Sequence, residues 1–187
     1  MPAPQPTDGL LSIGTGIRQR AAAIRLACFD VDGTLTDGRL WLDAEGRELK
    51  AFHIHDGMGL RLLEAHGVRV ALVTARHSAV AEARGRELRL SEVHIGIKDK
   101  RALLEQLCAK YGHTPTEAAM MGDDLVDLGA MAIAGLAVAP ANAHAAVKAR
   151  AHWCTRFGGG EGAARELADL LLEAQGKADA ALAGFLR

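Results

Sequence analysis

The sequence lacks any run of basic residues that could follow a nucleic-acid backbone. Its 187 residues carry 22 lysines and arginines against 23 aspartates and glutamates, for a net charge of −1 with histidine neutral. Binding to phosphate backbones depends on clustered positive charge. We therefore expect no nucleic-acid partner.

Long apolar runs and cysteines are also scarce. A membrane-spanning helix needs about 18 or more consecutive apolar residues, and no such run occurs. The N-terminus has no basic stretch leading into an apolar one, as an export signal would. The three cysteines are an odd number, and Cys28 and Cys108 lie in apolar segments, which favours reduced, buried side chains. These absences predict a cytoplasmic protein with no membrane partner.

The length fits one domain of ordinary size. Residues 1–20, which begin with a segment containing proline, glycine and threonine, are expected to form a poorly ordered leader, with a short helix over 18–23. Residues 21–176 would form the folded domain and 177–187 a C-terminal tail.

Short apolar runs separated mostly by segments of helical periodicity make up this domain. The predicted strands are residues 26–29, 68–73, 118–121 and 136–139. The predicted helices are residues 57–65, 78–88, 100–110, 125–134, 143–149 and 163–175. This alternation predicts an α/β fold with a doubly wound parallel sheet.

One segment departs from the alternation. Residues 39–43 and 48–55 are typical of two antiparallel strands around a turn at 44–47. We therefore expect a β-hairpin flap over about 39–55, directly after the first strand.

Two carboxylates follow the first predicted strand, in Asp30-Val31-Asp32-Gly33-Thr34. Ligands of open α/β folds bind at the carboxyl ends of the strands. There Asp30 could attack phosphorus as a nucleophile, and Asp32 could exchange a proton with the leaving oxygen. Taken alone, the pentapeptide is also compatible with a simple acidic turn.

Thr74 and Lys100 occupy comparable positions later in the chain. The Thr74 hydroxyl could donate to a phosphoryl oxygen or cap a helix. A lysine in the first turn of a helix opposes the helix dipole, at a cost of roughly 0.3–1 kcal/mol, and this suggests a nearby anion. Spacing alone does not choose between Lys98 and Lys100.

A second acidic motif, Gly122-Asp123-Asp124-Leu125-Val126-Asp127, follows the strand predicted over 118–121. Clustered carboxylate oxygens suit Mg²⁺. Asp124 and Asp127 could instead cap a helix and complement its dipole, whereas Asp123 is harder to explain in that way. Which of Asp124 and Asp127 supports the metal site stays open.

The chain resembles the haloacid dehalogenase superfamily in the order of four elements: the pentapeptide at 30–34, Thr74, Lys100 and the acidic motif at 122–127. The second acid of the pentapeptide, Asp32, is typical of the phosphatases of this superfamily. The resemblance implies that Asp30 is a nucleophile forming an aspartyl phosphate and that Asp32 is the general acid and base. It implies that Thr74 and Lys100 bind the phosphoryl group. Mg²⁺ would be held by Asp30, Asp123 and the backbone carbonyl of Asp32.

Phosphatases of this superfamily usually carry a cap domain, inserted after the first strand or after the threonine motif. Here only the hairpin and one helix separate Asp32 from Thr74, and a helix and a short strand separate Thr74 from Lys100. We therefore expect a Rossmann-like core without a cap. Water exclusion would then come from another subunit, which implies a homo-oligomer.

Residues 52–61, 74–76, 159–166 and 174–176 resemble one capless family, the 3-deoxy-D-manno-octulosonate 8-phosphate phosphatases, and the likeness extends over about 24–177. It implies a homotetramer with packed hairpins that releases inorganic phosphate from this sugar-acid phosphate, supplying 3-deoxy-D-manno-octulosonate (KDO) for lipopolysaccharide biosynthesis.

By matching position, the resemblance also implies a substrate-binding set, composed of His53, Ile54, His55, Asp56, Gly57, Arg61, Arg76 and Arg84. Three arginines suit a substrate with a phosphate and a carboxylate. Many members have arginine where this chain has His55. His53 and His55 are expected on one face of the second hairpin strand, where a paired-histidine metal site is a less favoured alternative because a third ligand is missing.

Two other functions stay open. One is a capless phosphatase for a nine-carbon, sialic-acid-type 9-phosphate, and the other is a non-catalytic oligomerisation module of the same fold. The intact Asp30, Asp32, Lys100 and Asp123 argue against the module. In the absence of a cap, we further expect residues 177–187 to close a neighbouring subunit's site.

Overall fold

The computed structural model describes residues 13–186 and contains a six-stranded parallel sheet in the order β5-β4-β1-β6-β7-β8. Its strands are β1 (Leu26–Phe29), β4 (Arg69–Val73), β5 (Glu92–His94), β6 (Ala118–Met121), β7 (Leu136–Ala139) and β8 (Trp153–Cys154). The chain places β4 and β5 on one side of β1 and β6 to β8 on the other. The strand order therefore changes direction at β1, the position where such sheets bind ligands.

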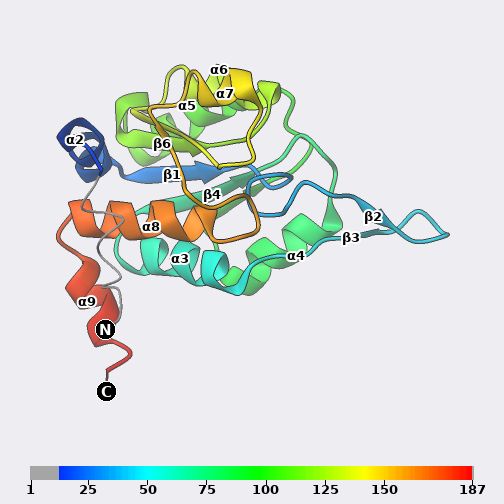
Figure 1. Ribbon diagram of the computed structural model, residues 1–187, viewed down its shortest axis with the longest axis horizontal. Helices are drawn as coiled ribbons and strands as arrows, with labels where there is room; N and C mark the ends of the chain where they lie inside the picture. The colour runs from blue at the N-terminus through cyan, green and yellow to red at the C-terminus, as the bar shows by residue number, and fades with distance from the viewer. Residues whose placement is uncertain (1–12, 187) are drawn as a thin grey trace, which may run out of the picture.

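Helices cover both faces of the sheet (Figure 1). One layer contains α3 (Ile54–Ala65), α4 (Ala79–Leu88) and α8 (Ala163–Ala174), and the other contains α5 (Lys100–Tyr111), α6 (Leu128–Met131) and α7 (Ala145–Lys148). Helices α2 (Thr15–Ala23) and α9 (Ala178–Ala183) pack beside α8. Two short 3₁₀ helices are η1 (Pro115–Glu117) and η2 (Leu125–Asp127). The predicted doubly wound α/β fold is confirmed.

The apolar character of β1 follows from its burial on both faces. Ala27 and Phe29 pack into the core under α3 and α8, whereas Leu26 and Cys28 pack into the core under α5. A strand buried on both faces has no polar position, so its sequence shows no alternation. Cys28 and Cys108 are buried free thiols.

The hairpin is shorter than predicted. Only β2 (Trp41–Leu42) and β3 (Glu48–Leu49) pair, and α3 begins at Ile54, three residues before its predicted start. The placement of His53 and His55 on one strand face is therefore wrong, because His55 lies in the first turn of a helix. Asp56 explains the early start, since an acid in the first turn complements the helix dipole.

The helix predicted over 125–134 is also divided, into η2 and α6. The Asp127 side chain bonds back to the N–H groups of Asp123 and Asp124, which tightens the first turn to a 3₁₀ geometry. The two-residue strand β8 had no clear sequence signal.

The ends of the chain differ in part from expectation. Helix α2 begins at Thr15 and so includes the last residues of the predicted leader, whereas residues 1–12 lie outside the described part. The predicted tail begins as α9, whose Ala181 is buried against the same chain.

No helix within residues 13–186 is both long enough and apolar enough to span a membrane. No cap domain interrupts this part of the chain either, since only the hairpin and α3 lie between β1 and β4 and only α4 and β5 between β4 and α5.

Because α8 packs against the sheet, we expect truncation of a leucine on α8, Leu167, to cost far more stability than truncation of an exposed leucine on α9, Leu182. Leu167 is fully buried, so Leu167→Ala should lower the free energy of unfolding by about 2–5 kcal/mol through lost burial and a cavity. Leu182→Ala, at an exposed position, should change it by about 0.5 kcal/mol or less. Urea denaturation followed by circular dichroism measures both, and equal costs would contradict this assignment of the core.

Candidate active site

The carboxyl ends of β1, β4 and β6 converge on a cavity of about 350 Å³. Its lining consists of Asp30, Asp32, Gly38, Leu40, Thr74, Ala75, Arg76, Asp123, Asp124 and Val126. Asp30, Thr74 and Asp123 come from three separate strand ends. The parallel register therefore gathers the predicted acids and threonine at one place.

Lys100 is a buried cation between Asp30 and Asp127. Its ammonium donates to Asp30 Oδ1 and, at 2.6 Å, to Asp127 Oδ1. Asp30 and Asp127 raise the pKa of Lys100, although burial opposes the shift. The anion suggested by a lysine at a helix start is thus Asp30, and Lys100 rather than Lys98 faces it.

The remaining oxygen of Asp127 organises the loop after β6. Asp127 Oδ2 accepts hydrogen bonds from the N–H groups of Asp123 and Asp124, at 3.0 and 3.1 Å. A side chain at Gly122 would collide with it, because a Cβ there would lie 2.3 Å from Asp127 Cγ. Asp124 caps η2 through a bond from the Leu125 N–H at 2.8 Å.

The carboxylates form a group that fits a divalent cation. Oxygens of Asp30, Asp123 and Asp127 lie within 4.8 Å of one another. Burial and repulsion from Asp127 raise the pKa of Asp30 to about 8 against the opposing effect of Lys100, and the same two causes raise that of Asp123 to about 6. One lysine therefore does not balance the buried negative charge. Hard oxygen donors suit Mg²⁺, and Asp30 and Asp123 are the available ones, since both Asp127 oxygens already accept hydrogen bonds.

Asp32 lines the same cavity but has different partners. Its Oδ2 accepts from Thr74 Oγ1 at 3.5 Å and lies 3.9 Å from Arg76 Nε, while its Oδ1 accepts from Lys50 Nζ. Sequence reasoning missed Lys50, because a single lysine beside the hairpin carries no motif. The same is true of its partner Glu48.

The loop that carries the two acids requires glycine. Gly33 has a φ of +92°, and a Cβ there would lie 2.1 Å from Asp123 Oδ2. Gly159 packs so closely that its Cβ would meet the Gly33 carbonyl oxygen at 1.9 Å. Asn142 joins the two segments, donating to Gly33 O at 3.0 Å and accepting from the Gly159 N–H at 2.7 Å. The glycine cluster at 158–160 thus has a packing role that its sequence did not indicate.

Of the eight residues in the predicted substrate-binding set, only Arg76 lines this cavity. His53 and His55 border a second cavity, of about 280 Å³, beside the start of α8. Ile54 and Arg61 are exposed. Within one chain, these four residues do not meet the Asp30 cavity.

Asp56, Gly57 and Arg84 fix the beginning of α3. Asp56 is buried and accepts from the Arg165 N–H of α8 at 2.8 Å. A Cβ at Gly57 would lie 2.3 Å from an Arg84 Nη2 atom, and the Arg84 guanidinium lies 5.4 Å from the centre of the Phe52 ring. Their contacts here are structural.

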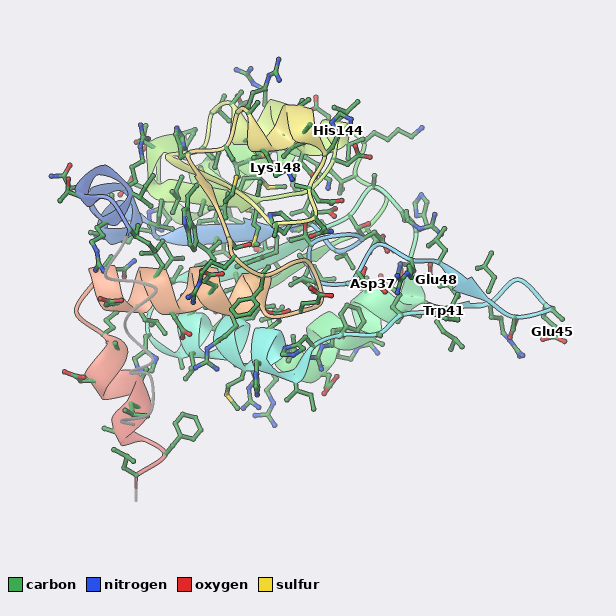
Figure 2. The ribbon with its side chains drawn as sticks, in the orientation of Figure 1. Asp37, Trp41, Glu45, Glu48, His144 and Lys148 are labelled. Carbon is green, nitrogen blue, oxygen red and sulfur yellow. The ribbon has the colours of Figure 1, made fainter. Side chains whose placement is uncertain are left out.

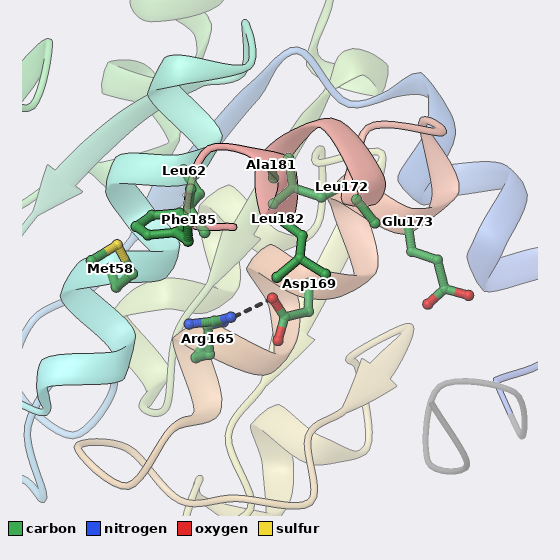
Figure 3. Close-up of a pocket in the computed structure, with 10 residues that line it drawn as sticks. Met58, Leu62, Arg165, Asp169, Leu172, Glu173, Ala181, Leu182 and Phe185 are labelled. Atoms are coloured by element: carbon green, nitrogen blue, oxygen red, sulfur yellow. Dashed lines mark hydrogen bonds and ion pairs between the residues drawn. The ribbon is translucent and has the colours of Figure 1, made fainter. Parts of the chain in front are cut away.

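A larger cavity of about 520 Å³ lies between α3, α8 and α9 (Figure 3). Its walls are mostly apolar, with Met58, Leu62 and Phe185 close together and the Arg165–Asp169 ion pair, at 2.8 Å, beside them. Its two carboxylates, Asp169 and Glu173, form ion pairs with Arg165 and Arg18, and its lining includes no lysine. It therefore lacks the combination of free acids and an ammonium group that chemistry at phosphorus needs.

Known proteins resemble the chain over most of its length. Residues 92–167 match the family described as haloacid dehalogenase-like hydrolase. The 3-deoxy-D-manno-octulosonate 8-phosphate phosphatase KdsC of Yersinia pestis is 41% identical over 169 residues, covering 90% of each chain.

Solved structures agree with this likeness. A hypothetical protein from Xanthomonas campestris is 51% identical, with a TM-score of 0.95 over 98% of this chain and 100% of that one. The 3-deoxy-D-manno-octulosonate 8-phosphate phosphatase of Moraxella catarrhalis, in complex with magnesium, phosphate and KDO, is 40% identical, with a TM-score of 0.88 over 90% of this chain and 97% of that one.

Replacement of Gly33 should damage cation binding specifically. In Gly33→Ala the new methyl group would displace the Asp123 carboxylate, and we expect Mg²⁺ affinity to fall about tenfold or more, equivalent to about 1.4 kcal/mol. Gly112→Ala is the matched control, since Gly112 also has a positive φ, +70°, but open space around it. Both variants should lose at least about 1–2 kcal/mol of stability because alanine disfavours a positive φ, and only the first should bind Mg²⁺ more weakly in calorimetry. Equal affinities would contradict the role of Gly33.

Proposed function

The chain belongs to the 3-deoxy-D-manno-octulosonate 8-phosphate phosphatase family of haloacid dehalogenase-like hydrolases, and from this premise we propose the chemistry of its site. The enzyme hydrolyses 3-deoxy-D-manno-octulosonate 8-phosphate to KDO and inorganic phosphate with Mg²⁺ as cofactor. The observation that carries the mechanism is the contact of Lys100 with Asp30 at the cavity shared with Asp32 and Asp123.

In the first step a carboxylate oxygen of Asp30 forms a bond to phosphorus while the bond from phosphorus to the sugar oxygen breaks. Burial and Asp127 raise the pKa of Asp30, and the Lys100 ammonium opposes them by favouring the ionised, nucleophilic form. Asp32 donates a proton to the departing sugar oxygen, which would otherwise leave as an unstable alkoxide. The products of this step are KDO and an aspartyl phosphate.

In the second step a water oxygen attacks the phosphorus of the aspartyl phosphate, and the bond to Asp30 breaks. Asp32, now ionised, accepts the proton from that water. Thr74 and Lys100 hold the phosphoryl oxygens through both steps. When bound, Mg²⁺ would be held by Asp30, Asp123 and the backbone carbonyl of Asp32, and it would supply positive charge that offsets the charge of the phosphoryl group.

Arg76 is the substrate-binding residue that one chain supplies by itself. Its guanidinium lies beside Asp32 at the cavity and suits the carboxylate of a sugar acid. We propose that the other members of the predicted set act across a subunit boundary. His53 and the exposed Ile54, His55 and Arg61 would contact a sugar acid bound to a neighbouring chain, while Asp56, Gly57 and Arg84 hold that helix end in place.

The projecting hairpin supports a homotetramer. Trp41 and Leu49, paired across the two strands, are 59% and 66% exposed, and Leu40 and Leu42 are also largely exposed. Figure 2 shows Trp41 on the projecting arm and Glu45 at its tip. An isolated two-stranded hairpin is marginally stable in water, so packing of these apolar side chains against other hairpins would stabilise both the arm and the assembly. We place the enzyme in the cytoplasm, in lipopolysaccharide biosynthesis.

A phosphate-release panel tests the activity. With Mg²⁺, the protein should prefer the eight-carbon sugar-acid 8-phosphate over a nine-carbon sialic-acid-type 9-phosphate and over neutral sugar phosphates, and chelation should abolish turnover. Asp30→Asn should lower kcat at least about 10⁴-fold because it removes the nucleophile. Glu105→Gln, a similar loss of charge on the exposed face of α5, should have no effect. Turnover by Asp30→Asn at the wild-type rate would overturn the mechanism, and preference for the nine-carbon ester would reassign the substrate.

Assembly through the hairpin is tested at one exposed position. Leu49→Glu places a charge in the proposed interface and should reduce the mass observed by native mass spectrometry from tetramer toward smaller species. Leu49→Met keeps the position apolar and should remain tetrameric. A fully active wild-type monomer would contradict the view that a subunit takes the place of the cap.

A further inference from the structure

Lys50 is a buried cation that the mechanism has not yet used. It lies just after β3, where the chain returns from the hairpin, and its side chain is 1% exposed. Its ammonium donates to Asp32 Oδ1 and lies 3.3 Å from Glu48 Oε2. Burying an ammonium group is costly unless it is paired. The two carboxylates provide that pairing.

Glu48 anchors Lys50 to a second element. The Glu48 carboxylate accepts a hydrogen bond from Ser78 Oγ and a weaker one from Arg76 Nη2 at 3.4 Å. Ser78 is buried and caps α4, accepting from the Ala81 N–H at 3.2 Å. The contacts from Ser78 through Glu48 to Lys50 therefore join the start of α4 to the base of the hairpin.

The two oxygens of Asp32 have different surroundings. Oδ1 accepts from Lys50, which does not line the cavity, whereas Oδ2 lies near Thr74 and Arg76, which do. Holding one oxygen fixes the direction in which the other points. A misplacement of about 1 Å at a reacting group can reduce the rate about 100-fold.

We propose that Lys50, held by Glu48, is a positioning residue that directs Asp32 Oδ2 toward the leaving oxygen of the substrate. The proton passes from Oδ2 to the sugar oxygen as the bond to phosphorus breaks, and it returns to Oδ2 from water in the second step. This inference rests on the proposed function, since Asp32 is the acid and base only in a phosphatase.

Leaving-group dependence tests this role. With enzyme in excess and Mg²⁺ present, release of the leaving group is followed in a single turnover for the sugar-acid 8-phosphate and for p-nitrophenyl phosphate. The sugar alkoxide needs a proton to leave, whereas p-nitrophenolate does not. Lys50→Met should slow sugar release about 10- to 100-fold and nitrophenolate release less than about threefold. The KM for the sugar phosphate should stay within about twofold of wild type.

Matched variants distinguish a positioning role of Lys50 from a general loss of stability or activity. Lys110→Met removes the ion pair with buried Glu92, at 2.5 Å, near the opposite end of α5 from Lys100, and should leave both rates unchanged. Lys50→Arg keeps the charge and should recover part of the sugar rate. If Lys50→Met fails to fold in a thermal melt, Glu48→Gln/Lys50→Met, which also removes one carboxylate charge, is measured with the same expectation.

Three outcomes would overturn the proposal: equal slowing with both substrates, an effect confined to KM, or wild-type rates in the folded variant. A wild-type enzyme that rejects the sugar-acid phosphate would instead refute the proposed substrate. The Lys50 comparison is then made with whichever alkyl phosphate the enzyme hydrolyses, so the two failures are distinguishable.

Discussion

The ion cluster of Lys100 with Asp30 and Asp127 is the interaction on which the site depends. It joins the end of β1, the first turn of α5 and the loop after β6, which are 70 and 27 residues apart along the chain. A buried ammonium group with two carboxylates is favourable only if each charge keeps its partners. The cluster therefore fixes three separate backbone segments together, and it leaves Asp30 and Asp123 close enough for a cation to complete the charge balance.

Those parts of the site that lie on central strands could be predicted from the sequence. The bounds of β1 and β6 match the apolar runs because both faces of these strands are buried, and a turn carrying acids follows each of them. Once the sheet is parallel, Asp30 and Asp123 must meet. Thr74 follows by the same reasoning from β4.

Contacts made by single polar residues on other elements could not be predicted. Lys50 and Asn142 act through one or two hydrogen bonds to distant loops, and no local pattern distinguishes them from surface residues. The hairpin was predicted too long because its second half alternates like a strand, whereas Asp56 and its bond to α8 favour a helix from Ile54. Tertiary contacts prevailed over local pattern at these positions.

The hydrogen bond between Asn142 and Gly33 joins residues 109 positions apart, and this separation affects the order in which the chain folds as it is synthesised. The ribosome releases the loop after β1 well before the segment around Gly159, which packs on this loop. Contacts so distant in sequence form late, after a large loop has been closed. A nascent chain that has emerged only as far as β7 can thus pair strands on both sides of β1 while the loop that carries Asp30 and Asp32 still lacks its contact with Gly159.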